Sequence, residues 1–109
     1  MEVQVKTVNN HVVVAIEGRL DTTQSDAFEK KMLEILQSGA DKIILDCERL
    51  EYISSSGLRV FLIMQKKMNV SGGQLKICNL QPIIKEIFEV SGFMMIFSVY
   101  PSVDAAIKA

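Results

Sequence analysis

The alternation of apolar and polar residues predicts that the chain begins with a β-hairpin. Apolar residues alternate with polar ones over positions 3–7 and again over positions 12–16. A period of two residues is typical of strands that bury one face. Asn9 and Asn10 lie between the two runs, and asparagine tolerates the left-handed conformations of tight hairpin turns. We therefore expect two antiparallel strands joined by a short turn.

Beyond the hairpin, helical and strand patterns alternate along the chain. Helical spacing of apolar residues and short continuous apolar runs mark the two kinds of element. The predicted helices cover residues 23–37, the segment from the serines at 54–56 to Ser71, the segment from Pro82 to Ser91, and a short segment after Pro101-Ser102; the predicted strands cover 42–47, 74–78 and 94–99. The resulting order, β-β-α-β-α-β-α-β-α, favours an α/β fold. We expect a single domain over residues 1–109, with a mixed, mostly parallel five-stranded sheet, the N-terminal hairpin and about four helices.

Charge and composition exclude several classes of function. The formal net charge of −1 gives no basic surface for nucleic acid. No apolar run approaches the roughly 20 residues that cross a membrane, and the first ten residues lack the apolar core of a signal peptide. Cys47 and Cys78 lie too far apart in the sequence to indicate a metal site or a disulfide framework. We expect a cytoplasmic protein with reduced thiols and with no cofactor, metal, nucleic-acid partner or membrane insertion.

The stretch YISSSG, residues 52–57, carries the candidate chemistry. Three consecutive serines follow a buried strand and a short loop, and they precede a helix. Catalysis by a serine requires a base, and His11, which we expect on an exposed strand face, is the only histidine. The nucleophile-elbow motif also fails, because Ile53 stands where the first glycine would precede Ser55. An enzyme is therefore the disfavoured hypothesis.

Two other roles for these serines remain open. A serine oxygen before a helix can accept a hydrogen bond from a backbone N–H that otherwise lacks a partner. The same helix start also accommodates a phosphate, through its free N–H groups and partial positive charge. A phosphoserine adds roughly −1.5 to −2 charges. Such a charge would switch the binding of a partner more readily than it would disrupt the fold.

Three segments of the chain carry a family signature. They are EGRLD at 17–21, IILDCERLEYISSSGLRVFL at 43–62 and SGGQLKICNLQPIIKEIFEVSGF at 71–93. Together they closely resemble STAS domains, the sulfate-transporter and anti-sigma-factor-antagonist family, along nearly the whole chain. The resemblance implies a STAS-like layered α/β fold and a single STAS domain.

The resemblance also implies a function. Short single-domain members of the family are anti-sigma factor antagonists, which bind a GHKL-type serine kinase that sequesters a sigma factor. Phosphorylation of the antagonist ends the interaction, and a PP2C-type phosphatase reverses it. Transferred to this chain, the phosphoacceptor is Ser55 and the second hydroxyl position is Ser56. Gly57 and Leu58 match directly, and Asp21 matches an aspartate near the partner surface, although it could equally cap the first helix.

One position departs from the family motif. Ser54 stands where the motif has an aspartate, so this chain keeps a capping oxygen but lacks a charge beside the acceptor. The predicted partner surface runs from Ser54 to Arg59 and is flanked by Asp21. The alternative is a non-switched STAS adaptor subunit of a transporter or signalling complex, in which the serines only cap the helix.

Three arginines and four methionines outside YISSSG are further candidates for a role in binding. Arg19, Arg49 and Arg59 could lie near the site and favour a phosphate, although exposed arginines are usually solvated surface. Four methionines, Met64, Met68, Met94 and Met95, are expected to fill the core, and a docking patch is the alternative.

Overall fold

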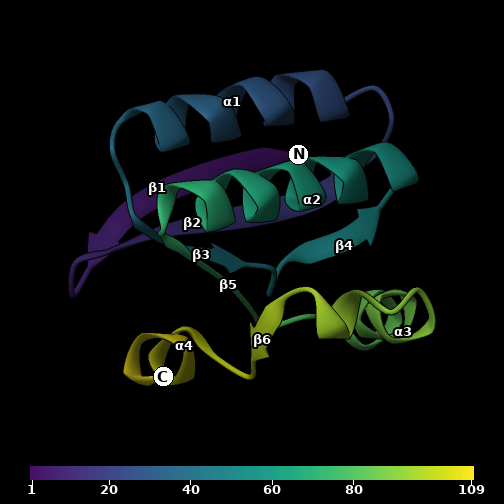
Figure 1. Ribbon diagram of the computed structural model, residues 1–109. Helices are drawn as coiled ribbons and strands as arrows, with labels where there is room; N and C mark the ends of the chain where they lie inside the picture. Colours follow the sequence, from purple (N-terminus) through teal and green to yellow (C-terminus); the bar gives the residue numbers. More distant parts are fainter.

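A mixed sheet of six strands forms the centre of the protein in the computed structural model, which describes residues 1–109 (Figure 1). Helices pack against both faces of this sheet. In chain order the elements are β1 (Glu2–Val8), β2 (His11–Leu20), α1 (Ser25–Gln37), β3 (Lys42–Asp46), β4 (Leu50–Ile53), α2 (Ser55–Ser71), β5 (Gln74–Cys78), α3 (Pro82–Val90), the 3-10 helix η1 (Phe93–Met95), β6 (Ser98–Tyr100) and α4 (Val103–Lys108).

The sheet has the predicted mixed character. Its strands run in the order β1-β2-β3-β5-β6, and only the β1–β2 pair is antiparallel. Asn9 and Asn10 form the hairpin turn, with positive φ angles of 47° and 65°. The α/β class, the N-terminal hairpin and the four α-helices are confirmed.

The sheet has one strand more than predicted. The sixth strand, β4, pairs in parallel with the end of β2, where Tyr52 lies opposite Arg19 and Ile53 opposite Leu20. The prediction missed it because β2 continues to Leu20, beyond the alternating residues 12–16. Since β3 pairs only with the first half of β2, the second half is free to bind β4.

The last predicted strand, 94–99, was misplaced. Phe93–Met95 form η1, and the strand β6 covers only Ser98–Tyr100. The amide of Phe97 donates to the carbonyl of Phe93, and the two rings pack 6.0 Å apart beside Phe88. This aromatic packing favours a helical turn over an extended strand.

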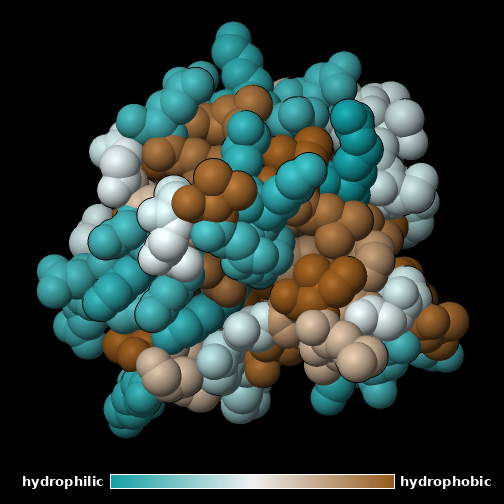
Figure 2. All heavy atoms as spheres, viewed as in Figure 1, coloured by the Kyte–Doolittle hydropathy of each residue, from teal (hydrophilic) through white to brown (hydrophobic).

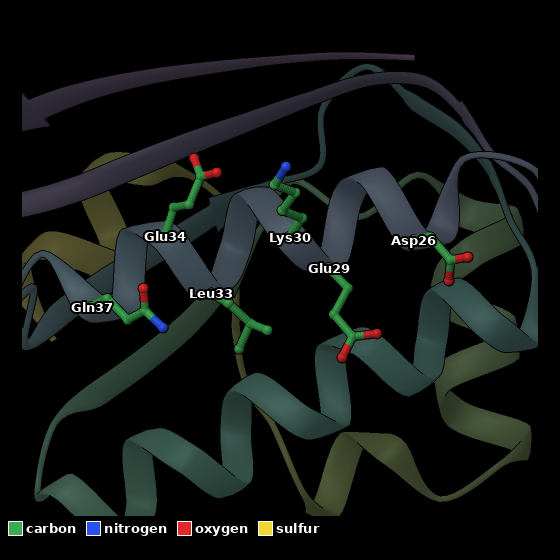
Figure 3. Close-up of a pocket in the computed structure, with 6 residues that line it drawn as sticks. All are labelled: Asp26, Glu29, Lys30, Leu33, Glu34 and Gln37. Carbon is green, nitrogen blue, oxygen red and sulfur yellow. The ribbon is translucent and has the colours of Figure 1, made fainter.

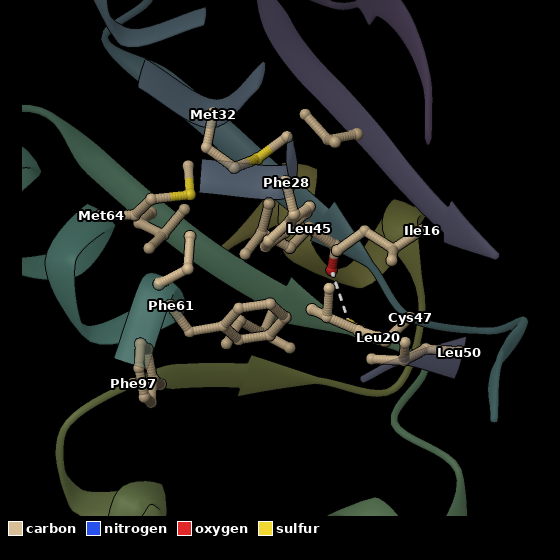
Figure 4. Close-up of a cluster of buried hydrophobic side chains, with 14 of the residues drawn as sticks. Ile16, Leu20, Phe28, Met32, Leu45, Cys47, Leu50, Phe61, Met64 and Phe97 are labelled. Atoms are coloured by element: carbon tan, nitrogen blue, oxygen red, sulfur yellow. Dashed lines mark hydrogen bonds between the residues drawn. The ribbon is translucent and has the colours of Figure 1, made fainter. Parts of the chain in front are cut away.

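The main core lies between the sheet and α1, α2 and α3. Phe61 of α2 is its centre, with a ring centroid 5.9 Å from that of Phe28 of α1 (Figure 4). The ring centroid of Phe88 of α3 lies 6.4 Å from that of Phe61. A smaller core on the other sheet face joins Val13, Ile44 and Cys78 to Ala106 of α4. None of the helices combines the length and apolar character needed to cross a membrane.

Two expectations about exposure were wrong. His11 is buried, and its Nδ1 lies 2.8 Å from the carbonyl oxygen of Asn9 in the hairpin turn. Met64 and Met68 lie in the core as predicted and Met94 packs partly buried against it, but Met95, in η1, is 93% exposed. On the face seen in Figure 2, apolar residues form patches among hydrophilic ones.

Candidate functional site

The site lies where β4 leads into α2. Ser54 is the N-cap of α2, and its Oγ accepts a hydrogen bond of 3.1 Å from the amide of Gly57. Its own amide donates to the carbonyl of Leu20 at 2.9 Å, which ties the loop to the end of β2. Ser54 as a whole is 7% exposed. The capping role predicted for this serine triplet therefore belongs to Ser54.

Ser55 is the exposed member of the triplet. It is the first residue of α2, and its side chain makes no hydrogen bond within the chain. The unpaired N–H groups and the partial positive charge of the helix start surround it. Its hydroxyl is thus accessible, and the electrostatic environment is suited to a negative charge.

Ser56 points toward α1. Its Oγ lies 2.7 Å from Oγ of Ser25 and 3.0 Å from Oγ of Ser54. Both helices begin on the same side of the molecule, at the right of Figure 1. Ser25 was missed by the sequence analysis, because nothing in the local pattern reveals a contact between residues 31 positions apart.

Asp21 organises the turn between β2 and α1. Its Oδ1 accepts hydrogen bonds from the hydroxyl of Thr23 at 2.7 Å, the amide of Thr23 at 3.0 Å and the amide of Gln24 at 3.2 Å. The hydroxyl bond from Thr23, helped by the two amides and by Arg19, lowers the pKa of the Asp21 carboxyl. The N-cap position of α1 is Gln24, whose side chain forms no cap, so Asp21 caps this turn and α1 starts at Ser25 instead of residue 23.

Gly57 allows α2 to approach the sheet closely. A Cβ atom at this position would lie 2.8 Å from Cγ of Leu20 and 3.0 Å from Cγ1 of Ile53. The absence of a side chain at Gly57 therefore lets the start of α2 pack closely on Leu20 and Ile53. Of the two residues that follow, Leu58 is half-buried against the main core, whereas Arg59 faces solvent.

Two of the three arginines have side-chain partners, whereas Arg59 is exposed and its side chain forms no ion pair or hydrogen bond. Cζ of Arg19 lies 4.3 Å from the ring centroid of Tyr52, its neighbour across the β2–β4 pair. Arg49 forms an exposed ion pair with Glu17 at 3.7 Å. Tyr52 is 39% exposed, and its contact with Arg19 was not predicted because it depends on the pairing of β4 with β2.

Neither the surface groove along α1 nor the histidine belongs to this site. The groove, of about 480 Å³, is lined only by residues of α1, namely Asp26, Glu29, Lys30, Leu33, Glu34 and Gln37 (Figure 3). It includes no residue of the serine triplet and only one apolar side chain. His11 is the first residue of β2, whereas the serines adjoin its last residue, Leu20. His11 therefore lies at the opposite end of β2 from the serines.

Comparisons with known proteins agree with this architecture. BtrV of Bordetella bronchiseptica is 33% identical over 109 residues, which span 100% of this chain and 94% of BtrV. The anti-sigma F factor antagonist of Paenibacillus polymyxa is 28% identical, over 92% of this chain and 86% of that protein. The structure of the Bacillus cell fate determinant SpoIIAA in its phosphorylated form superposes with a TM-score of 0.75, at 25% identity, over 98% of this chain and 97% of SpoIIAA. The sequence profile of the STAS domain matches residues 2–106, and the chain belongs to the STAS domain family.

Proposed function

We propose that this protein is an anti-sigma factor antagonist that is switched by phosphorylation of Ser55. The observation that carries the proposal is the separation of two roles in the triplet. Ser54 caps α2, while Ser55 is exposed and unbonded on the first turn. A phosphate on Ser55 would therefore leave the cap intact. The names and structures of the relatives support the same role.

We place the partner surface around the same helix start. Ser54, Ser56, Gly57, Leu58 and Arg59 form the loop and first turn of α2, and Asp21 lies beside them at the end of β2. In the unphosphorylated state this surface binds a GHKL-type anti-sigma serine kinase, and a sigma factor is released. The protein acts in the cytoplasm as one STAS domain and catalyses nothing itself.

Phosphorylation ends this interaction through charge and bulk. The added phosphate is stabilised by the helix start, so the domain stays folded. A partner packed over Ser55 would have to bury that charge and make room for its bulk, which costs several kcal/mol of binding. A PP2C-type phosphatase restores the binding state. Ser54 in place of the motif aspartate leaves no charge next to Ser55, so the kinase must recognise a neutral cap.

Affinity capture tests the proposal. The wild-type chain, Ser55→Asp and Ser55→Ala are immobilised and exposed to a lysate of the source organism, and bound proteins are identified by mass spectrometry. We expect a serine kinase on the wild type and Ser55→Ala, with a loss of at least about tenfold, or 1.4 kcal/mol, on Ser55→Asp. Gln37→Glu, which adds a charge at the far end of α1, is the matched control and should bind normally.

Two results would contradict the switch. One is equal kinase binding by Ser55→Asp and the wild type. The other is the absence of phosphate on Ser55 and Ser56 after incubation with the captured kinase and ATP. The second result would favour the alternative, a non-switched adaptor subunit in which the serines serve only the helix start.

A further inference from the structure

Three serine hydroxyls from distant segments form a row between α1 and α2. Oγ of Ser54 lies 3.0 Å from Oγ of Ser56, which lies 2.7 Å from Oγ of Ser25. Ser25 in turn lies 2.9 Å from the carbonyl oxygen of Asp21. Ser25 and Ser54 are only 5% and 7% exposed, so water cannot readily replace these contacts.

Counting protons gives this row a direction. A serine hydroxyl has one proton to donate, and the carbonyl of Asp21 can only accept, so the proton of Ser25 goes to Asp21. Ser25 must then accept the proton of Ser56, and Ser56 must accept that of Ser54. Ser54 also accepts the amide of Gly57. In this arrangement every hydroxyl proton has an acceptor.

The opposite direction is unfavourable for two reasons. It leaves the buried proton of Ser54 without an acceptor, which costs the desolvation of that group. It also leaves Oγ of Ser25 and the carbonyl oxygen of Asp21 2.9 Å apart with no proton between them, so that their lone pairs repel. The row is therefore a directed chain from Ser54 through Ser56 and Ser25 to the backbone of Asp21.

We propose that Ser25 determines which serine of the first turn of α2 is phosphorylated. By accepting the proton of Ser56, it holds that hydroxyl toward α1. Of the two neighbouring hydroxyls, only that of Ser55 then faces a docked kinase. Ser25 is a positioning residue, and its role rests on the proposed function, because it selects the acceptor for that same kinase.

The transfer step shows why Ser56 is disfavoured. The acceptor oxygen forms a bond to the γ-phosphorus of ATP, the bond from that phosphorus to the β–γ bridging oxygen breaks, and ADP leaves with the electron pair. The hydroxyl proton passes to a base of the kinase. Ser55 can do this from its resting position. Ser56 must first leave Ser25 and rotate outward, which also removes the acceptor for the proton of Ser54.

A test without kinase measures the χ1 rotamer of Ser56 by NMR scalar couplings. We expect one rotamer in the wild type and averaging in Ser25→Ala. Ser38→Ala is the matched control, because Ser38 lies at the other end of α1 and also donates to a backbone carbonyl. Ser25→Thr keeps the hydroxyl and should restore the single rotamer. A single rotamer in folded Ser25→Ala would overturn the proposal.

A second test maps phosphate after incubation with ATP and the kinase captured by the wild-type chain. Ser25→Ala should raise the share on Ser56 by roughly fivefold to tenfold, the effect of one lost hydrogen bond on a rotamer equilibrium. In a Ser55→Ala background, Ser25→Ala should create phosphorylation of Ser56 that Ser38→Ala does not. An unchanged site distribution overturns the inference alone. A wild type that takes no phosphate overturns the proposed function and, with it, the selection of an acceptor by Ser25, and the NMR test then shows only whether Ser25 fixes the rotamer of Ser56.

Discussion

At the scale of single residues, the three serines of YISSSG have three different environments. Successive side chains on a helix point about 100° apart, so neighbours at a helix start face different surroundings. Ser54 lies before the first turn and caps it, Ser55 faces solvent, and Ser56 faces Ser25 of α1. This division allows one position to change its charge while its neighbours hold the helix in place.

The cap can be tested by stability. Ser54→Ala removes the acceptor for the Gly57 amide, and we expect a loss of about 1 kcal/mol in the free energy of unfolding, within the 0.5–2 kcal/mol range of lost caps. Urea denaturation followed by circular dichroism measures it. Ser55→Ala, which removes an exposed and unbonded hydroxyl, should change stability by less than about 0.5 kcal/mol. Equal losses in both variants would contradict the assignment of the cap to Ser54.

The carboxylate of Asp21 should make stability depend on pH. Its pKa is lowered below the ordinary value of 3.8 in the folded protein, chiefly by the Thr23 hydroxyl. Its contribution is therefore fully present above the unfolded pKa and is lost as the pH falls through the folded pKa. We expect Asp21→Asn to lose stability relative to the wild type at pH 6, and the difference to shrink below about pH 4.

Thr23→Val provides the control for this carboxyl. It removes the hydroxyl that contributes most to the lowered pKa and keeps the two amide bonds. NMR titration of Asp21 should show a higher pKa in this variant than in the wild type. An unchanged pKa would mean that the hydroxyl does not stabilise the carboxylate.

At the scale of elements, the unforeseen strand β4 places the site. By pairing with the second half of β2, β4 brings the start of α2 next to the end of β2. The serines thus adjoin Arg19 and Asp21, although they lie more than 30 positions away from both in the chain. At the opposite face, α4 depends on a single buried charge. Lys76 of β5 is 7% exposed, and its Nζ donates to the carbonyls of Ala106 at 2.8 Å and Ala109 at 3.2 Å.

Removing that charge should loosen α4. Lys76→Met keeps the length of the side chain but leaves the two carbonyls at the end of α4 without their donor. We expect a loss of about 1–2 kcal/mol in stability and faster amide hydrogen exchange confined to α4. Lys108→Met breaks only an exposed ion pair with Asp104 and should cost about 0.5 kcal/mol or less. Uniform exchange changes throughout the sheet would argue against this local role.

At the scale of the whole molecule, the sheet separates two cores of unequal size. The larger one joins α1, α2 and α3, and the smaller one holds α4. Cys47 belongs to the larger core and Cys78 to the smaller, although the amide of Cys47 donates to the carbonyl of Cys78. Burial raises the pKa of the Cys78 thiol to about 12 and raises that of Cys47 well above its ordinary value, with a further increase from Asp46.

These thiols should report on both cores at once. Because the thiolate is the reactive form, we expect both cysteines to resist alkylation by iodoacetamide at pH 8 in the folded protein. Both should react fully in urea, where burial is lost. Cys47→Ala and Cys78→Ala assign the two labelling rates by mass spectrometry. Rapid labelling of Cys78 alone under native conditions would show that α4 detaches without global unfolding.

The local pattern of residues determined the hairpin turn at Asn9-Asn10, the helices and most of the strands, because side-chain period and turn chemistry act over a few positions. It also placed candidate capping serines at the start of α2. Only the tertiary structure decided that β4 pairs with β2, that Phe93 and Phe97 close a helical turn, and that Ser56 faces Ser25. These features depend on contacts between residues distant in the chain, or on competition for the same core, which no local pattern encodes. The division of YISSSG into a cap, an exposed hydroxyl and a buried hydrogen-bond chain arises from that packing of α2 against α1 and β2.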